Sequence, residues 1–221
     1  MGGFQNQLLN ERFKHNFFKM IVASLVNGCK LMVDDCSAKK ILLQNHEEKI
    51  RTHLLENYLE NDEIRCKIGL SNIHIRFLAE VPENYIAETD TYAGRTDIRV
   101  VSSNWLRNPK DYYIVECKRL DGTNSLNKKY VVDGICRFVG DTPKYSSYNK
   151  KNIMLGFIVA DVDSMVIISE ITKTHLEELK EHITSDLSLI ENNTTHQLCK
   201  STYTNNLSLT HIFYNISSAV S

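Results

Sequence analysis

Two short apolar runs that each hold an acidic residue constrain the fold of this chain most. The first run carries Asp97, and the second ends in Glu116, Cys117 and Lys118. β-Branched and aromatic residues dominate both runs, and this composition is typical of β-strands. Side chains two apart on a strand lie on one face, so Glu116 and Lys118 share a face while Cys117 points into the opposite layer.

Two carboxylates that converge at the end of neighbouring strands form an oxygen-rich site suited to Mg²⁺ or Mn²⁺. A metal and an ammonium side by side polarise a phosphodiester, position a water and offset developing negative charge. The placement of Asp97, Glu116 and Lys118 on adjacent strands therefore predicts a metal-dependent hydrolytic site.

The arrangement resembles the PD-(D/E)xK superfamily, the restriction-endonuclease-like nucleases, over residues 40–160. The chain departs from that pattern at Thr96, where the family often has a proline before the first acid. The resemblance implies an α/β fold with a central mixed β-sheet flanked by helices, here with an N-terminal helical extension. It also implies Mg²⁺-dependent (or Mn²⁺-dependent) hydrolysis of DNA. Asp97, Glu116 and the carbonyl of Cys117 would bind the metal, and Lys118 would orient or activate the attacking water.

Glu-x-Lys triplets occur at residues 47–49, 116–118 and 178–180. The first and third lie in charged stretches with helical periodicity, where residues two apart do not face each other. Only the second ends an apolar, strand-like run and follows another strand that carries an aspartate. We therefore place the motif at 116–118.

A third acidic residue is expected, by the same resemblance, from the helix before the sheet. Glu47 falls at the centre of an apolar helical stripe, and Glu48 falls at its edge. A carboxylate centred on an apolar face is costly unless a cation or a hydrogen bond meets it. We favour Glu47 as the residue that completes the site. Glu48, or two solvated glutamates, are the alternatives.

Two arginines are candidate substrate contacts. Arg137 lies in a predicted helix beside Gly134, and a glycine inside a helix indicates close backbone approach, here to the sheet. Arg137 either holds a phosphate or pairs with Asp133 one turn earlier. Arg95 is either a phosphate contact or a local partner of Asp97.

Length and periodicity predict one domain, and the family resemblance implies that it is nuclease-like, with a helical extension (residues 1–36), a catalytic core (37–165) and a C-terminal helix with strands (166–221). Helices are expected at 4–33, from Ser37 to residue 58 or 59, and at 125–139 and 174–190. Strands are expected at 72–79, 95–101, 111–118 and 153–160, with a terminal hairpin of 197–204 and 208–216. Residues 80–94 are interpreted as a loop.

Charge, apolar runs and cysteine spacing limit the classes of partner that we expect. The net charge is −1, but residues 107–151 hold ten Lys or Arg and five Asp or Glu, which suits either a phosphate backbone or a solvated surface. The longest apolar run, 153–160, is too short to span a bilayer, so no membrane partner is expected. The six cysteines form no Cys-x-x-Cys pair and are interpreted as free thiols of a cytoplasmic protein.

The sequence thus predicts an endonuclease with DNA as its partner, acting as a homodimer or as a subunit of a larger restriction or phage-defence complex. The assembly is expected from the family resemblance alone. Two alternatives stay open: an interaction subunit that keeps the fold without activity, and a nuclease that acts on RNA. The intact set of Asp97, Glu116 and Lys118 favours an active enzyme.

Overall fold

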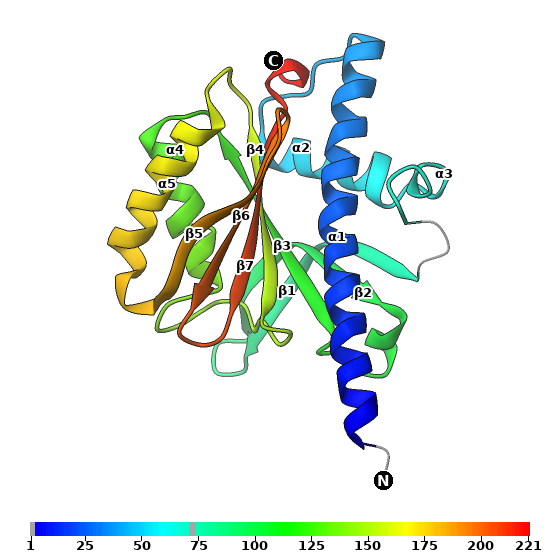
Figure 1. Ribbon diagram of the computed structural model, residues 1–221, viewed down its shortest axis with the longest axis vertical. Helices are drawn as coiled ribbons and strands as arrows, with labels where there is room; N and C mark the ends of the chain where they lie inside the picture. The colour runs from blue at the N-terminus through cyan, green and yellow to red at the C-terminus, as the bar shows by residue number, and fades with distance from the viewer. Residues whose placement is uncertain (1–2, 71–73) are drawn as a thin grey trace.

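The computed structural model describes residues 3–70 and 74–221, which form an α/β protein with helices on both faces of an open sheet (Figure 1). Within these residues the sheet has seven strands in the order β1-β2-β3-β4-β7-β6-β5. β3, β4 and β7 run parallel at its centre, and the strands towards both edges pair antiparallel. The predicted mixed sheet with flanking helices and a long N-terminal helix is confirmed.

The strands are β1 (Ile75–Ile86), β2 (Thr91–Ser102), β3 (Tyr112–Leu120), β4 (Lys151–Ile158), β5 (Ile183–Asn192), β6 (His196–Tyr203) and β7 (Ser208–Asn215). β3 and β4 are buried along almost their whole length. Strands covered on both faces have continuous apolar sequences rather than alternating ones. This burial explains why both runs stand out in the sequence.

The helices are α1 (Gly3–Lys39), α2 (Glu47–Leu54), α3 (Asp62–Arg65), α4 (Asn124–Val132) and α5 (Ser164–Leu179). α2 continues into a π-helical turn (Leu55–Leu59), and 3-10 turns lie at Ser103–Leu106, Ile135–Arg137, Lys180–His182 and Ser217–Ala219. In Figure 1, α4 and α5 lie on one side of the sheet, and α1 crosses the other.

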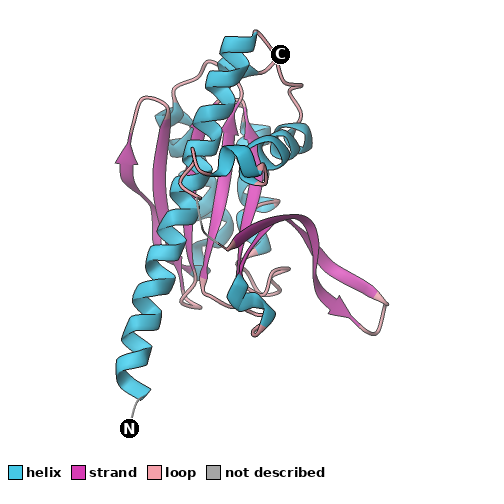
Figure 2. Cartoon of the chain, turned by 90° about the vertical axis from the view of Figure 1, so that its right-hand side faces the viewer, coloured by secondary structure: helices cyan, strands magenta, loops and turns pink. Residues whose placement is uncertain are grey.

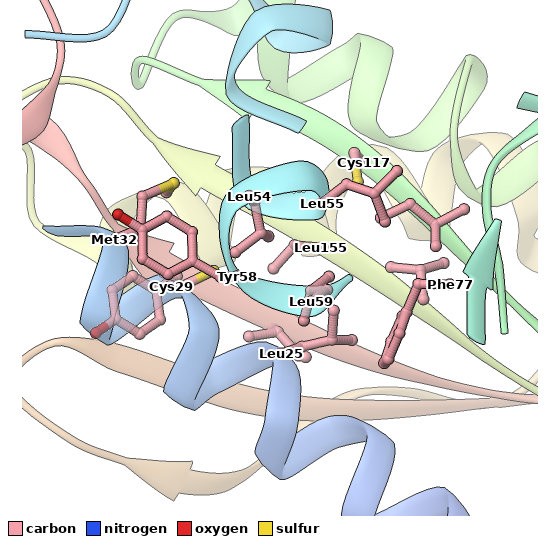
Figure 3. Close-up of a cluster of buried hydrophobic side chains, with 14 of the residues drawn as sticks. Leu25, Cys29, Met32, Leu54, Leu55, Tyr58, Leu59, Phe77, Cys117 and Leu155 are labelled. Atoms are coloured by element: carbon pink, nitrogen blue, oxygen red, sulfur yellow. The ribbon is translucent and has the colours of Figure 1, made fainter. Parts of the chain in front are cut away.

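The sheet is packed on both faces. Leu25 of α1 and the leucines of the α2 turn pack against strand residues that include Cys117 (Figure 3). Residues of α4 and α5 pack against the other face, which includes Met154. The thiol of Cys117 therefore lies in the α1 layer, opposite the face that carries Glu116 and Lys118, as strand alternation predicts.

The stretch Glu11–Lys39 of α1 has the length and composition of a membrane span, which buried helices of soluble proteins and signal sequences share. In this structure one face of the helix belongs to the core, where Ile21, Leu25, Cys29 and Met32 are fully buried. Polar and charged residues interrupt this stretch, so it contains no apolar run as long as 153–160.

α1 continues beyond its predicted end. The sequence predicts a break after residue 33 and a new helix capped by Ser37, but one helix runs to Lys39. Asp34 pairs with Lys30, and Asp35 pairs with Lys39, each four residues away. Such pairs stabilise a helix, so the two aspartates belong to α1 instead of ending it.

Residues 75–102 form one long hairpin where two short strands and a loop were expected. β1 and β2 pair from Ile75 with Ser102 as far as Ile86 with Thr91. β1 contains Pro82, which is compatible with a strand because β1 lies at the edge of the sheet, where a missing N–H is tolerated. The first residues of the predicted strand 72–79 lie outside the described residues. Figure 2 shows the far end of the hairpin extending away from the body.

The C-terminal part contains a strand where the sequence predicts a helix over 174–190. α5 starts earlier, where the Asp163 side chain accepts a hydrogen bond from the Met165 N–H at 2.9 Å, and it ends at Leu179. The residues from Ile183 onward form the edge strand β5, because pairing with β6 overrides their helical periodicity. The predicted terminal hairpin is confirmed as β6 and β7.

The helix predicted over 125–139 is also shorter. α4 ends at Val132, and Gly134 lies at the turn before the 3-10 segment. A Cβ on Gly134 would meet the carbonyl oxygen of Tyr130 and, at 2.6 Å, the Cε of Met154 on β4. The predicted close approach of this glycine to the sheet is confirmed.

Gly134→Ala should lower the free energy of unfolding by about 1–3 kcal/mol, because the added methyl group would clash with the backbone carbonyl of Tyr130 as well as with Met154 on β4. Urea unfolding of both proteins measures the change. Gly28→Ala in α1 is the matched control, since its Cβ would lie 3.3 Å from the flexible ends of Leu54 and Leu59 and alanine favours a helix. Equal stability of the wild type and Gly134→Ala would contradict the packing explanation.

Candidate functional site

The predicted acidic residues meet at a cleft formed by α2, the base of the β1–β2 hairpin, the end of β3 and α4. The cleft encloses about 480 Å³, and charged side chains line most of it, among them Glu47, Arg51, Lys118 and Arg137. A larger hollow of about 800 Å³ near Trp105 holds none of the predicted site residues.

Asp97 lies where β2 and β3 separate. Ladder pairing between these strands stops at Ile98 with Val115. Just beyond, Asp97 Oδ2 accepts a hydrogen bond from the backbone N–H of Cys117 at 2.7 Å. The carboxylate therefore replaces a strand carbonyl at the fork, and it satisfies a buried donor that the ladder no longer reaches.

The ammonium of Lys118 lies at the centre of the site. Its Nζ donates to Glu116 Oε1 and to the carbonyl oxygen of Cys117, both at 2.8 Å, and to Glu47 Oε1 at 3.3 Å. Asp97 Oδ2 is 4.0 Å from the same Nζ. Four oxygen atoms from four residues thus surround one cation, whose side chain is only 8% exposed.

Glu47, the preferred of the two glutamates at the start of α2, joins the site. Besides contacting Lys118, its Oε2 accepts a hydrogen bond from the backbone N–H of Arg119 at 2.8 Å. Glu48 lines the same cleft but is exposed. The geometry therefore supports Glu47, which connects the first turn of α2 to β3.

Arg51 is a site residue that the sequence reasoning missed. Its Nη1 donates to Asp97 Oδ1 and its Nη2 to Glu80 Oε1, both at 2.7 Å, and its side chain is almost fully buried. The hydrogen bond from Arg51 also lowers the pKa of Glu80. Arg51 follows Glu47 by four residues and so shares its helix face, and this spacing is the signal that identifies it.

Arg137 reaches the site through a carboxylate. Its Nη1 lies 3.2 Å from Glu116 Oε1 and donates to the Tyr145 hydroxyl at 2.7 Å. That hydroxyl donates to Glu116 Oε2 at 2.8 Å. The alternative pairing of Arg137 with Asp133 is wrong, because the helix breaks at Gly134 between them.

Arg95 lies at the edge of the site and pairs with Glu80 at 3.1 Å rather than with Asp97. The alternative in which it partners Asp97 is therefore wrong. Its side chain is 64% exposed, so the guanidinium is accessible from solvent.

Burial dominates the electrostatics of the site. Burial, and after it the charge of Asp97, raise the pKa of Glu116 from 4.5 to about 7, although Lys118 and Arg137 oppose the shift. Burial alone would lower the pKa of Lys118, but the charges of Glu116, Glu47 and Asp97 outweigh it and raise that pKa. Lys118 is therefore a permanent cation at neutral pH, whereas Glu116 exchanges its proton near neutrality.

The residues around Lys118 have the donor chemistry of a divalent-metal site. Three carboxylates and one backbone carbonyl face its ammonium, and such oxygen atoms are the ligands that Mg²⁺ and Mn²⁺ prefer. Among the described residues, no three acidic, histidine or cysteine side chains stand ready to hold a metal, and the Lys118 ammonium lies among the carboxylates. The ammonium of Lys118 thus occupies the position among these oxygen atoms that a metal would take, and a metal would compete with it for them.

Comparison of the chain with known protein families, curated proteins and solved structures finds no match. The chemistry and geometry of the cleft are therefore the basis for assigning a function.

Glu116→Gln should change stability in a pH-dependent way. A raised pKa in the folded state means that the protonated carboxyl stabilises the fold below pH 4.5, and this stabilisation is lost as the pH rises to about 7. The loss of unfolding free energy caused by Glu116→Gln should therefore decrease as the pH rises from 4.5 to about 7, by at most about 3 kcal/mol. Urea unfolding of both proteins in EDTA, from pH 4.5 to 8, measures it. A difference that does not vary with pH would contradict the raised pKa.

Proposed function

We propose that the protein is a Mg²⁺-dependent (or Mn²⁺-dependent) endonuclease of the PD-(D/E)xK type with a restriction-endonuclease-like core, and that it hydrolyses phosphodiester bonds in DNA. The observation that carries this proposal is the convergence of Glu47, Asp97, Glu116 and the Cys117 carbonyl on the ammonium of Lys118. A set of hard oxygen ligands beside a lysine suits phosphodiester hydrolysis.

Asp97, Glu116 and the carbonyl of Cys117 would hold the metal, with Glu47 beside them. A divalent ion bound there supplies Lewis-acid polarisation of a phosphoryl oxygen and a more acidic water. Lys118, freed from the carboxylates, would orient the attacking water and offset the negative charge of the transition state.

Arg137 would bind the substrate while it positions Glu116. Its Nη1 faces Glu116 and Tyr145. The side chain is 29% exposed and lines the cleft, so its other amino group has access to a phosphate oxygen. A guanidinium suits this double task because its fork of donors binds two partners at once. Arg95, on the exposed base of the hairpin, adds positive charge on the approach to the cleft.

A second candidate, an interaction subunit without activity, is favoured by one observation. Arg51, Lys118 and Arg137 each pair with a site carboxylate, so the protein neutralises its own acidic cluster. A subunit that needs only the fold would keep such a network for stability. The proposed setting, a homodimer or a subunit of a cytoplasmic restriction or phage-defence complex, comes from family analogy.

Wild-type protein should nick supercoiled plasmid DNA in Mg²⁺ or Mn²⁺ and lose this activity in EDTA. Glu116→Gln should lower the rate by at least about 10²–10³-fold, the scale of losing one electrostatic stabiliser in an active site. Agarose gels with DNA and RNA substrates in parallel also identify the preferred nucleic acid. Glu48→Gln is the matched control from the same cleft and should keep the activity. Absence of cleavage with folded wild type would favour the inactive subunit, whereas equal cleavage by Glu116→Gln would contradict the role proposed for Glu116.

Lys118→Met should bind Mn²⁺ more tightly while losing cleavage. Removing the ammonium leaves the oxygen atoms of Glu116 and Cys117 without their cation, so the affinity should rise by about tenfold or more. Calorimetric titration with Mn²⁺ measures affinity independently of catalysis. Lys129→Met, which changes an exposed lysine of the same cleft, is the control. Weaker Mn²⁺ binding by Lys118→Met would show that the lysine does not compete with the metal.

A further inference from the structure

The far end of the β1–β2 hairpin, residues 84–92, exposes an aromatic cluster; we name it the hairpin arm. Tyr85 and Tyr92 face each other across the strands and are 56% and 55% exposed, and Ile86 beside them is 37% exposed. The two tyrosine rings pack edge to face with their centroids 5.4 Å apart. A bare two-stranded ribbon is only marginally stable in water. An exposed apolar cluster on such a ribbon indicates a contact surface.

The charge of the hairpin arm excludes a nucleic-acid backbone as its partner. Glu88 and Asp90 lie at its tip, and residues 84–92 contain no lysine or arginine. A phosphate backbone repels such a surface. The arm therefore fits a partner that offers apolar contact and positive charge together.

A groove with those properties lies between α1 and the face of β6 and β7, away from the proposed active site. It encloses about 580 Å³, and Phe18, Val22, Val26 and Leu198 contribute apolar surface to it. This volume lies in the range of about 300–1,000 Å³ typical of ligand sites. We name it the α1 groove.

The lining of the α1 groove is basic. Lys19, Lys151 and Lys200 contribute to it, and Glu191 is its single acidic residue. Its apolar surface and positive charge complement the tyrosines and the two carboxylates of the hairpin arm. In Figure 2 the arm extends away from α1, so a contact between these two surfaces requires two molecules.

We propose that the hairpin arm of one copy docks in the α1 groove of a second copy, and that a pair of such contacts joins two molecules. This contact reaches the active site through the base of the arm. Asn84 donates from its side chain to the Lys144 carbonyl at 2.7 Å, and the next residue, Tyr145, binds Glu116. Docking of the arm therefore acts on a strand that is hydrogen-bonded to the segment that positions a site carboxylate.

Sedimentation velocity of the full chain tests the proposal independently of nuclease activity. The wild type should shift from monomer to dimer between about 1 and 100 µM, the range expected for a modest interface. Tyr85→Ser with Tyr92→Ser should weaken association at least about tenfold, since buried aromatic anchors dominate interfaces. A wild type that stays monomeric throughout overturns the proposal.

Charge reversal identifies the two surfaces. We consider an arm variant (Glu88→Lys with Asp90→Lys) and a groove variant (Lys19→Glu with Lys200→Glu). Each should be monomeric alone, because the arm and the groove of the arm variant are both positive, and those of the groove variant are both negative. Mixing them should restore dimers, since both contacts become attractive again. Glu177→Lys on exposed α5 is the control and should dimerise like wild type.

Failure of the mixture to associate, with both variants folded by circular dichroism, overturns the pairing of arm with groove. An arm variant that dimerises normally but binds DNA differently overturns it too, because the arm would then contact the substrate. These outcomes are separate from the nuclease proposal, which a monomeric but active protein would leave intact.

Discussion

The buried ammonium of Lys118 holds the acidic residues of the candidate site together. Without a cation among them, the carboxylates of Glu47, Asp97 and Glu116 would repel one another, and buried charges of one sign are costly. Lys118 relieves this repulsion and links α2 to β3 through Glu47. The group that occupies the oxygen cluster therefore adds a polar link between α2 and the sheet to the apolar packing of this segment.

The fork between β2 and β3 positions Asp97 and, through it, Arg51. Beyond Ile98 the two strands no longer pair, and β2 continues with β1 into the hairpin arm. Asp97 closes the fork by binding the Cys117 N–H, and Arg51 fixes the other oxygen of Asp97. The cleft and the arm are consequently two ends of one structural feature. Any contact that moves the arm acts on strands that also carry site residues.

Much of the candidate site could be predicted from sequence because strand alternation is local. The shared face of Glu116 and Lys118 follows from their spacing, and the apolar stripe around Glu47 follows from helical periodicity. Tyr145 could not be found in this way. It lies in an irregular segment, and its contact with Glu116 depends on the three-dimensional path of the chain between α4 and β4.

The same distinction between local and distant contacts explains which elements of the fold could be predicted from the sequence. Buried β3 and β4 have strong, continuous apolar patterns, so their existence is predictable. The errors concern segments whose state depends on distant partners. β5 is an exposed edge strand that owes its conformation to pairing with β6, and the outer part of the β1–β2 hairpin contains Pro82 and several acids. In α1, the acidic pair at its end looks like a break until its i,i+4 lysines are considered.

The identity of residue 118 matters for how the cleft would admit a divalent ion. The site carboxylates already have internal cations, so a metal of the kind proposed would have to displace one of these cations. Arg51 is held by two hydrogen bonds of 2.7 Å to two different carboxylates, and a guanidinium fork bound in this way is difficult to displace. Lysine presents a compact, strongly hydrated charge on a flexible stem. Of the cations in the cleft, Lys118 is thus the one whose chemistry would suit both the observed state, in which it holds the carboxylates together, and the proposed state, in which it would leave them free to bind a metal.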